Sequence, residues 1–285
     1  MNIISVVMAA HNAEDTIAEA VESVLNQSFT DFEVIIVNDG STDCTCSKIR
    51  SYSDSRIRLI EHERDYAQSL NTGLNVSKGK YIARMDTNDR MHVDRLKIQH
   101  SIMESFPEVT VCSCNEIVFG EKIPGRVSEQ KMSGLVESPL IQLLLDEKIT
   151  TSAYMIRHSF ITTHHLLYKN FPYAEDYRFL TEAAKWNGIF YIESQPLEYR
   201  RISDVSISRK RRLEMLQSFS KIKMEILSSL CGNNKEEFPA LQSLHKAYDE
   251  LLEQNLITVN EVIRIFNELI KKNEDKMNIN NVCQK

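Results

Sequence analysis

The sequence predicts an α/β fold with a mostly parallel central sheet flanked by helices, and three observations support this prediction. Short apolar runs rich in β-branched residues recur through the first part of the chain, as in strands buried on both faces. Segments with apolar residues at helical spacing separate these runs. Polar or glycine-containing turns follow the runs, so strand and helix alternate as far as about residue 106.

The first helix is expected to begin after Asn12, a good helix-capping residue, because residues 17, 21, 24 and 25 then form one apolar face. A short polar helix follows the turn at 38–41. A third helix is predicted over 66–76, before the turn at 78–80. Predicted strands cover 3–8, 32–37, 57–60 and 81–85, and the last runs directly into the polar string 86–89.

The pattern changes in the second half of the chain. A polar loop is predicted over 120–138 and a helix over 175–186. From residue 209 nearly everything is helical, with segments near 209–230, 240–254 and 258–272. We therefore divide the chain into two units, a domain at 1–208 and a helical C-terminal extension at 209–285. We expect the domain to fold without the extension. Short strands are predicted over 109–114, 117–119, 153–156 and 189–192.

Composition and charge exclude several classes of protein. Hydrophobic residues make up 42% of the chain and charged residues 26%, which is typical of a folded globular protein. The net charge of -6 argues against a nucleic-acid partner. No run of about 18 apolar residues is present, and the N-terminus lacks a signal-peptide pattern, so we expect a cytoplasmic protein.

Three polar clusters follow strands of the predicted sheet, at 10–12, 39–41 and 86–89. Ligands of open α/β sheets bind beyond the carboxyl ends of the strands. Each cluster alone has a plain explanation, as a helix cap, a turn or a solvated loop, but three at one edge indicate a binding site. The sequence has no dinucleotide-binding or phosphate-loop glycine motif, so carboxylates would meet a diphosphate through Mg²⁺ or Mn²⁺.

The stretches that contain these clusters resemble the family 2 glycosyltransferases, inverting enzymes with the Rossmann-like GT-A fold. The resemblance is closest to bacterial enzymes of surface-polysaccharide biosynthesis. It implies transfer of a sugar, most simply from a UDP-sugar, to a hydroxyl of a saccharide or lipid-linked saccharide acceptor. The matching blocks occur in the family's order at 5–29, 32–45, 69–99, 171–180 and 199–208.

The resemblance also implies roles for individual residues. Asp39 matches the family's nucleobase-reading carboxylate, which accepts the imide N–H of uracil, and His11 stands where an aromatic residue stacks beside the base. Asp176 matches the catalytic base, with Glu175 as its supporting neighbour. The full set implied for the donor nucleotide is Ala10, His11, Asn12, Asp39, Asn71, Gly73, Arg84, Asp86, Arg200 and Arg201.

The segment 86–88 aligns with the family's Asp-x-Asp motif, whose carboxylates hold ribose and a metal ion. This implies a site for Mn²⁺ or Mg²⁺ formed by Asp86, Asn88 and Asp89. Asn88 departs from the motif because it offers a neutral carbonyl oxygen, and Ser203 stands where many relatives carry a histidine.

These two departures leave a second interpretation open, a catalytically degenerate protein that binds sugar nucleotides or acts as a scaffold. A nucleotidyltransferase is a third interpretation, which the missing glycine- and lysine-rich loop disfavours. The apolar stripes of the C-terminal extension and the basic cluster at 209–212 leave two roles open for that region, a homodimer face or peripheral contact with the inner face of a membrane.

Overall fold

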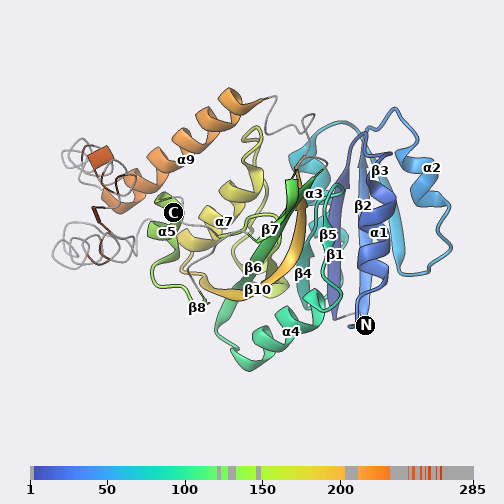
Figure 1. Cartoon of the computed structure of the whole chain (residues 1–285), viewed down its shortest axis with the longest axis horizontal. Helices are drawn as coiled ribbons and strands as arrows, with labels where there is room; N and C mark the ends of the chain where they lie inside the picture. The colour runs from blue at the N-terminus through green and yellow to red at the C-terminus, as the bar shows by residue number, and fades with distance from the viewer. Residues whose placement is uncertain are drawn as a thin grey trace.

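The computed structural model contains one mixed β-sheet with helices on both faces (Figure 1). The structure describes residues 3–120, 123–127, 133–145, 149–202 and 211–231, with scattered residues between 243 and 264. The strands of this described part are β1 (Ile4–Ala10), β2 (Phe32–Asp39), β3 (Ile57–His62), β4 (Tyr81–Arg84), β5 (Arg90–Met91), β6 (Val109–Gly120), β7 (Ile123–Val127), β8 (Gly134–Leu135), β9 (Met155–Arg157) and β10 (Ile189–Arg201).

The strands lie in the order β3-β2-β1-β4-β9-β6-β10-β5, with β7 beside β6 and β8 beside β10. β1 pairs in parallel with β2 and β4, β2 with β3, and β6 with β10. β9 runs antiparallel between β4 and β6. The mostly parallel sheet predicted from the sequence is therefore confirmed, and the carboxyl ends of β1, β2 and β4 share one edge.

Helices cover both faces of the sheet because the central strands are apolar on both sides. Along β1, Val7 and Ala9 point into one hydrophobic cluster while Val6 and Met8 point into the other. The described helices are α1 (Ile17–Leu25), α2 (Thr45–Arg50), α3 (Tyr66–Val76), α4 (Arg95–Ser105), α5 (Pro139–Leu144), α6 (His158–Thr163), α7 (Glu175–Lys185) and α9 (Arg212–Cys231). The first cluster packs under α3, α5, α6, α7 and α9, and the second under α1, α2 and α4.

The start of α1 differs from the prediction. Asn12 does not cap the helix, because α1 begins at Ile17 with Thr16 at its N-cap position. Asn12 instead adopts a left-handed backbone conformation, with φ of 46°. Its side-chain Oδ1 accepts the backbone N–H of Thr42 at 2.8 Å, so the amide joins the loop after β1 to the loop after β2. A cap-type residue can bond a turn in another loop equally well, and only the fold decides which.

The second half also departs from the predicted elements. The strands expected at 109–114 and 117–119 are one strand, β6, and the expected loop at 120–138 contains β7 and β8. β10 continues past 192 to Arg201 because it pairs with β6 through register shifts near 193–198, which no local pattern reveals. The sequence pattern misses α4 because its buried face holds Arg95 and Gln99 beside Leu96 and Met103, so no apolar stripe forms.

Helix α9 lies beside α5 and α7, away from α1 and α2 (Figure 1). Its residues Ile222, Ile226 and Leu227 are fully buried in the cluster that also contains α5 and α7. Phe219 stacks on Tyr177 of α7 with ring centroids 4.6 Å apart. The described part of the extension therefore shares the core of the first 208 residues.

Several predicted features lie outside the described residues. They are the boundary at 208/209, the first two residues of the basic cluster at 209–212, and most of the helices predicted at 240–254 and 258–272. The division into two units stays a prediction. Among the described residues, no helix combines the length and hydropathy needed to cross a membrane.

Candidate active site

The loops that follow β1 and β2 lie against each other at the carboxyl edge of the sheet. His11 Nδ1 is 2.8 Å from the carbonyl oxygen of Asp39. The backbone N–H of Asn12 donates to the Ser41 hydroxyl at 3.1 Å, and that hydroxyl lies 3.3 Å from the Ala10 carbonyl oxygen. The structure thus brings together four of the residues predicted to bind the donor, as the parallel pairing of β1 and β2 leads one to expect.

The two ring nitrogens of His11 face different kinds of partner. A carbonyl oxygen only accepts hydrogen bonds, so Nδ1 carries the proton that points to Asp39. A guanidinium only donates, so Nε2 accepts from Nη1 of Arg64. The imidazole is held from both sides and remains partly exposed, which leaves its ring available for stacking.

The Asp39 side chain is buried, with 3% of its surface exposed, and connects β2 to the start of α3. Its Oδ1 accepts the backbone N–H of Asp65 at 2.7 Å and the hydroxyl of Ser69 at 2.9 Å. Asp65 in turn caps α3 by accepting the N–H of Gln68 at 3.0 Å. Among the described residues, no side chain or backbone group bonds Asp39 Oδ2, so this oxygen is an available acceptor.

Asn71 and Gly73, both predicted to bind the donor, have packing roles on α3. The Asn71 amide bonds the backbone of Tyr168 twice, from Nδ2 to the carbonyl at 3.0 Å and from the Tyr168 N–H to Oδ1 at 2.8 Å. A Cβ atom at Gly73 would lie 2.5 Å from Cγ1 of Val7, so the glycine allows α3 to approach β1 closely. A donor contact for either residue stays a prediction.

Arg84, at the end of β4, joins the two carboxylates to which the sequence assigns chemistry. Its side chain is 1% exposed. Nε lies 3.1 Å from Asp176 Oδ1, and Nη2 lies 3.2 Å from Asp176 Oδ2 and 2.5 Å from Asp86 Oδ1. Nη2 also donates to the Tyr66 hydroxyl at 2.5 Å. One buried cation therefore links the predicted base to the predicted metal-binding loop.

Burial raises the pKa values of Asp176 and its neighbour Glu175. Desolvation raises the pKa of Asp176 to about 6, although the Arg84 guanidinium lowers it. Desolvation also raises the pKa of Glu175 to about 7, and the negative charge of Asp176 adds to that rise. Asp176 stands in the first turn of α7, so the positive end of the helix dipole favours its ionised form. A carboxylate with a pKa near 6 is suited to accept a proton at neutral pH.

The 86–89 loop is held against the end of β10. Asp89 is 2% exposed, and its Oδ1 accepts the backbone N–H of Arg201 at 2.8 Å. The Arg201 Nε donates to the carbonyl oxygen of Asn88 at 3.0 Å. Burial raises the pKa of Asp89 to about 8, and the nearby charge of Asp86 contributes. Asp89 is thus directed into the protein, while the Asn88 side chain is exposed.

Both arginines predicted to meet the diphosphate have partners within the protein. Arg200 Nε lies 2.9 Å from each carboxylate oxygen of Glu116. Arg201 Nη2 lies 2.7 Å from Glu19. The structure brings both arginines to the 86–89 loop, but each already has a carboxylate partner. Their contact with a diphosphate stays a prediction.

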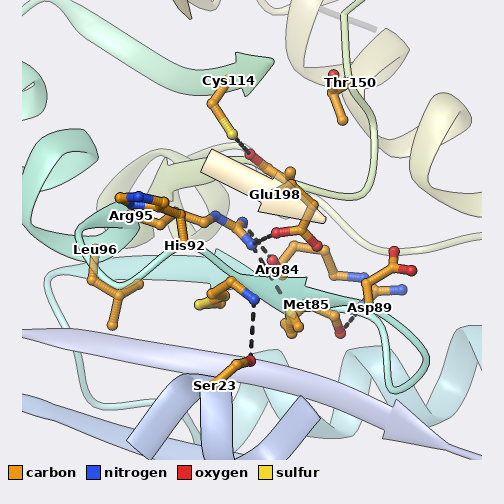
Figure 2. A network of polar contacts seen from close by, with 12 residues as sticks. Ser23, Arg84, Met85, Asp89, His92, Arg95, Leu96, Cys114, Thr150 and Glu198 are labelled. Carbon is orange, nitrogen blue, oxygen red and sulfur yellow. Dashed lines mark hydrogen bonds and ion pairs between the residues drawn. The ribbon is translucent and has the colours of Figure 1, made fainter. Parts of the chain in front are cut away.

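A second buried ion pair lies beside Arg84 (Figure 2). Arg95 Nη1 and Glu198 Oε2 are 2.6 Å apart, and both side chains are fully buried. Arg95 Nη2 donates to the carbonyl oxygen of Arg84 at 2.7 Å, which fixes the end of β4. Burial raises the pKa of Glu198 well above its usual range, against the attraction of Arg95.

Sequence reasoning assigned no role to Arg95, Glu198, Tyr66 or Tyr168, although all four surround the site. The only sequence signal for Arg95 is Gln99, which follows at helical spacing and accepts from its Nε at 3.2 Å. The tyrosines have no sequence signal, because their contacts come from different elements. Among the described residues, no three His, Cys, Asp or Glu side chains form a group that would hold a metal ion.

Comparisons with known proteins place the chain among the glycosyltransferases. Residues 5–174 match the sequence profile described as "Glycosyl transferase family 2". A Haemophilus influenzae protein named "Uncharacterized glycosyltransferase" is 30% identical over 210 residues, covering 70% of this chain and 65% of the relative. The Escherichia coli "UDP-Glc:alpha-D-GlcNAc-diphosphoundecaprenol beta-1,3-glucosyltransferase WfgD" is 33% identical over 134 residues, covering 46% of this chain and 53% of the relative. The matched regions span less than two thirds of either relative.

Solved structures share the fold. The S. aureus TarS 1-349 structure in complex with UDP-GlcNAc superposes with a TM-score of 0.64 at 18% identity, covering 82% of this chain and 68% of that one. The Pyrobaculum calidifontis mannosyltransferase PcManGT, in complex with GDP-Man and Mn²⁺, gives a TM-score of 0.53 at 13% identity, covering 93% and 86%. These likenesses show that the chain has the GT-A fold expected from its sequence.

Proposed function

Because the chain belongs to glycosyl transferase family 2, we propose that it transfers a sugar from a nucleotide diphosphate donor to an acceptor hydroxyl in the synthesis of a bacterial surface polysaccharide. The single observation that carries this proposal is the Arg84 side chain, which bonds both Asp86 and Asp176 at the edge of the sheet. A carboxylate able to take a proton thereby stands next to the loop expected to meet the diphosphate.

The proposed reaction proceeds with inversion. Asp176 takes the proton of the acceptor hydroxyl as the acceptor oxygen forms a bond to C1 of the sugar. The bond from C1 to the diphosphate breaks on the opposite face, and its electron pair leaves with the nucleoside diphosphate. Arg84 keeps Asp176 ionised before the transfer, and burial makes the same carboxylate basic enough to accept the proton. Positioned proton transfer of this kind contributes about 10²–10⁴ to a rate.

We propose a uridine diphosphate donor. Asp39 Oδ2, which no described residue bonds, is an acceptor that complements the imide N–H of uracil, and the His11 ring bonds the Asp39 backbone carbonyl. The E. coli relative carries UDP-Glc in its name, and the S. aureus structure holds UDP-GlcNAc. The donor contacts predicted for Ala10, Asn12, Arg200 and Arg201 belong to the same proposal.

The family implies a divalent cation, and part of the predicted ligand set fits one. Both contacts of Asp86, from Arg84 and Tyr66, involve Oδ1, and the side chain is 29% exposed. Its Oδ2 is bonded by no described residue. We therefore propose that Asp86 and Asn88 hold Mn²⁺ or Mg²⁺, which when bound would neutralise charge on the departing diphosphate. Asp89 is left out of this proposed set, because its side chain is 2% exposed and its Oδ1 accepts the Arg201 N–H. A metal contact for Asp89 stays a prediction.

The acceptor is proposed to be a saccharide, free or linked to a lipid, since the E. coli relative's name includes a diphosphoundecaprenol acceptor. Work on such an acceptor would take place at the inner face of the membrane. Leu213 and Leu216, exposed on α9, are the described apolar side chains that would contact it or a second copy of the chain.

A panel of nucleotide sugars tests the function. UDP-glucose, UDP-galactose, UDP-N-acetylglucosamine and GDP-mannose are each added with Mn²⁺. The melting temperature is recorded, together with the release of nucleoside diphosphate by hydrolysis, in which water is the acceptor. A ligand at 100 times its dissociation constant stabilises a protein by about 2.7 kcal/mol, so a true donor produces a clear shift. Stabilisation without release of the diphosphate, with and without Mn²⁺, would instead support the degenerate sugar-nucleotide-binding protein.

A further inference from the structure

Tyr168 connects α3 to the proposed base through the middle of the molecule. The residue is 3% exposed, and its hydroxyl donates to Oδ1 of Asp176 at 3.2 Å. Its ring stacks on Phe179 of α7, with ring centroids 4.3 Å apart and an interplanar angle of 13°. The ring and the hydroxyl therefore contact the same helix, α7, at two points one turn apart.

The backbone of Tyr168 is held from the other side by Asn71. The planar amide of Asn71 makes two hydrogen bonds to this one residue, at 3.0 Å to its carbonyl and at 2.8 Å to its N–H. Asn71 lies in the middle of α3, and the start of that helix is anchored by Asp39. Tyr168 thus cannot shift without breaking bonds to α3.

Counting protons shows the direction of the hydrogen bonds. A tyrosine hydroxyl has one proton, and Tyr168 gives its proton to Asp176, so the Tyr154 hydroxyl must donate to Tyr168. Burial raises the pKa of Tyr168 well above its usual range, so its hydroxyl keeps that proton. The chain of donors therefore ends at the carboxylate.

The two oxygens of Asp176 are consequently unequal. Oδ1 accepts from both Tyr168 and Arg84 Nε, which fills its two acceptor positions. Oδ2 accepts from Arg84 Nη2 at 3.2 Å and from no other group in the part of the chain that the structure describes. One acceptor position of Oδ2 remains for a proton.

We infer that Tyr168 and Asn71 are positioning residues, which orient the Asp176 carboxylate so that Oδ2 takes the proton of the acceptor hydroxyl. This inference rests on the proposed role of Asp176 as the base. It gives Asn71 a function different from the donor contact that the sequence predicts. Without the Tyr168 hydroxyl, Arg84 alone would orient the carboxylate, and the proton-accepting oxygen would be less well placed.

The first test compares Tyr168→Phe with Tyr177→Phe in the full chain, using UDP release from the UDP-sugar that the panel selects. Tyr177 is the matched control, because it is a buried tyrosine like Tyr168. It lies on α7, and its hydroxyl donates to the Leu143 carbonyl instead of to Asp176. Tyr168→Phe is expected to lower kcat about tenfold to a hundredfold with donor KM unchanged, the effect of losing a hydrogen bond to a charged group. Tyr177→Phe should keep kcat within twofold, even where its melting temperature falls.

The second test replaces Asn71 by leucine, which has a similar shape and makes neither hydrogen bond. If Asn71 acts through Tyr168, Asn71→Leu lowers kcat without raising donor KM, and the double variant with Tyr168→Phe is no slower than the worse single variant. A raised donor KM with unchanged kcat would overturn the inference and favour the donor contact. Independent, multiplied losses in the double variant would also contradict it.

Asp176→Asn, measured in parallel, separates this inference from the proposed function. If Asp176→Asn abolishes turnover while Tyr168→Phe stays within twofold of wild type, the base is correct and the positioning role is wrong. If Asp176→Asn keeps wild-type turnover, the base assignment fails and the inference fails with it.

Discussion

Arg84 donates two hydrogen bonds to Asp176, from Nε to Oδ1 at 3.1 Å and from Nη2 to Oδ2 at 3.2 Å, although the residues are 92 positions apart. Such a paired contact fixes the plane of the carboxylate as well as its distance. The same Nη2 reaches Asp86, so the geometry of the base and that of the 86–89 loop depend on one side chain.

Asp176→Asn is expected to lower turnover by roughly two to four orders of magnitude, the usual worth of a general base. The two side chains are nearly isosteric, so the protein should still fold and should bind UDP with almost unchanged affinity. Steady-state UDP release and calorimetry with UDP check the two parts. Turnover within threefold of wild type would show that Asp176 is not the base.

Turnover is expected to rise with pH through about 6 and then level off, because only the ionised carboxylate accepts a proton and the pKa of Asp176 is raised to about 6. Below that pH the carboxylate is protonated and the rate falls tenfold per unit. The pH profile of kcat/KM, which reports the pKa values of the free protein, measures this. Glu175→Gln is the matched control, since it removes the neighbouring group with a pKa of about 7 and should leave the rise near pH 6 in place.

Asp39→Asn is expected to weaken UDP binding by about 1–3 kcal/mol, the cost of an unmade hydrogen bond at a desolvated site, while the melting temperature changes little. The amide oxygen would replace Oδ1, which accepts from Asp65 and Ser69, so its NH₂ would face the imide N–H of the base. Calorimetry with UDP and thermal melting test this.

Asp39→Ala provides the comparison for this site. It should lose affinity to a similar extent, and its melting temperature should fall as well, because the N–H of Asp65 and the hydroxyl of Ser69 lose their acceptor. Turnover at saturating donor should fall much less than affinity. Unchanged UDP affinity in both variants would remove Asp39 from the nucleobase site.

Asn88→Asp is expected to tighten Mn²⁺ binding, with a larger effect when UDP is present, because a charged ligand is added to a cation shared with the diphosphate. Without metal, the new charge stands close to Asp86 and lowers the melting temperature slightly. The variant should therefore lose stability in chelator and regain it in Mn²⁺ plus UDP.

Asp89→Asn is the control for this change. Asp89 is buried against Arg201, so its substitution should leave the Mn²⁺ affinity within twofold of wild type. Titrating Mn²⁺ into the three proteins with UDP present decides the matter. Equal affinities for wild type and Asn88→Asp would show that residue 88 does not face the cation.

Truncation after Ser208 is expected to prevent stable folding, in contrast to the independent folding that the sequence pattern predicts. The truncation removes Ile222, Ile226 and Leu227 from the common core, and each fully buried side chain of this kind is worth about 1.5–3 kcal/mol. That sum approaches the total stability of a typical domain, about 5–15 kcal/mol. Circular dichroism melting measures the result, and a truncated chain with a wild-type transition would contradict it.

The contribution of α9 to the core can also be measured with the helix in place. Ile226→Ala should destabilise the protein by about 2–5 kcal/mol, because it leaves a cavity in a packed core. Leu213→Ala on the same helix should change stability by less than about 0.5 kcal/mol, since Leu213 is 77% exposed.

The sequence by itself determined the alternation of strand and helix in the first half, because apolar periodicity and turn residues are local properties. It also located the edge of the sheet at which the loops 10–12, 39–41 and 86–89 begin, because parallel strands present their carboxyl ends together. Family resemblance then predicted Asp176 as the base, and the structure brings that residue beside Arg84 at the end of β4.

Only the tertiary structure decided how those residues are used. Asn12 bonds a neighbouring loop instead of capping α1, Asn71 holds Tyr168, and Asp89 turns inward to Arg201. Helix α9 joins the core of the first 208 residues instead of packing alone. In each case the partner lies far away in the chain. For Asn71 and Asp89, whose contacts are partly buried, loss of water also favours the hydrogen bond that the fold supplies. A polar group that is removed from water needs a hydrogen-bond or ion-pair partner, and the fold determines which group is close enough. The spacing of residues along the chain does not reveal that partner.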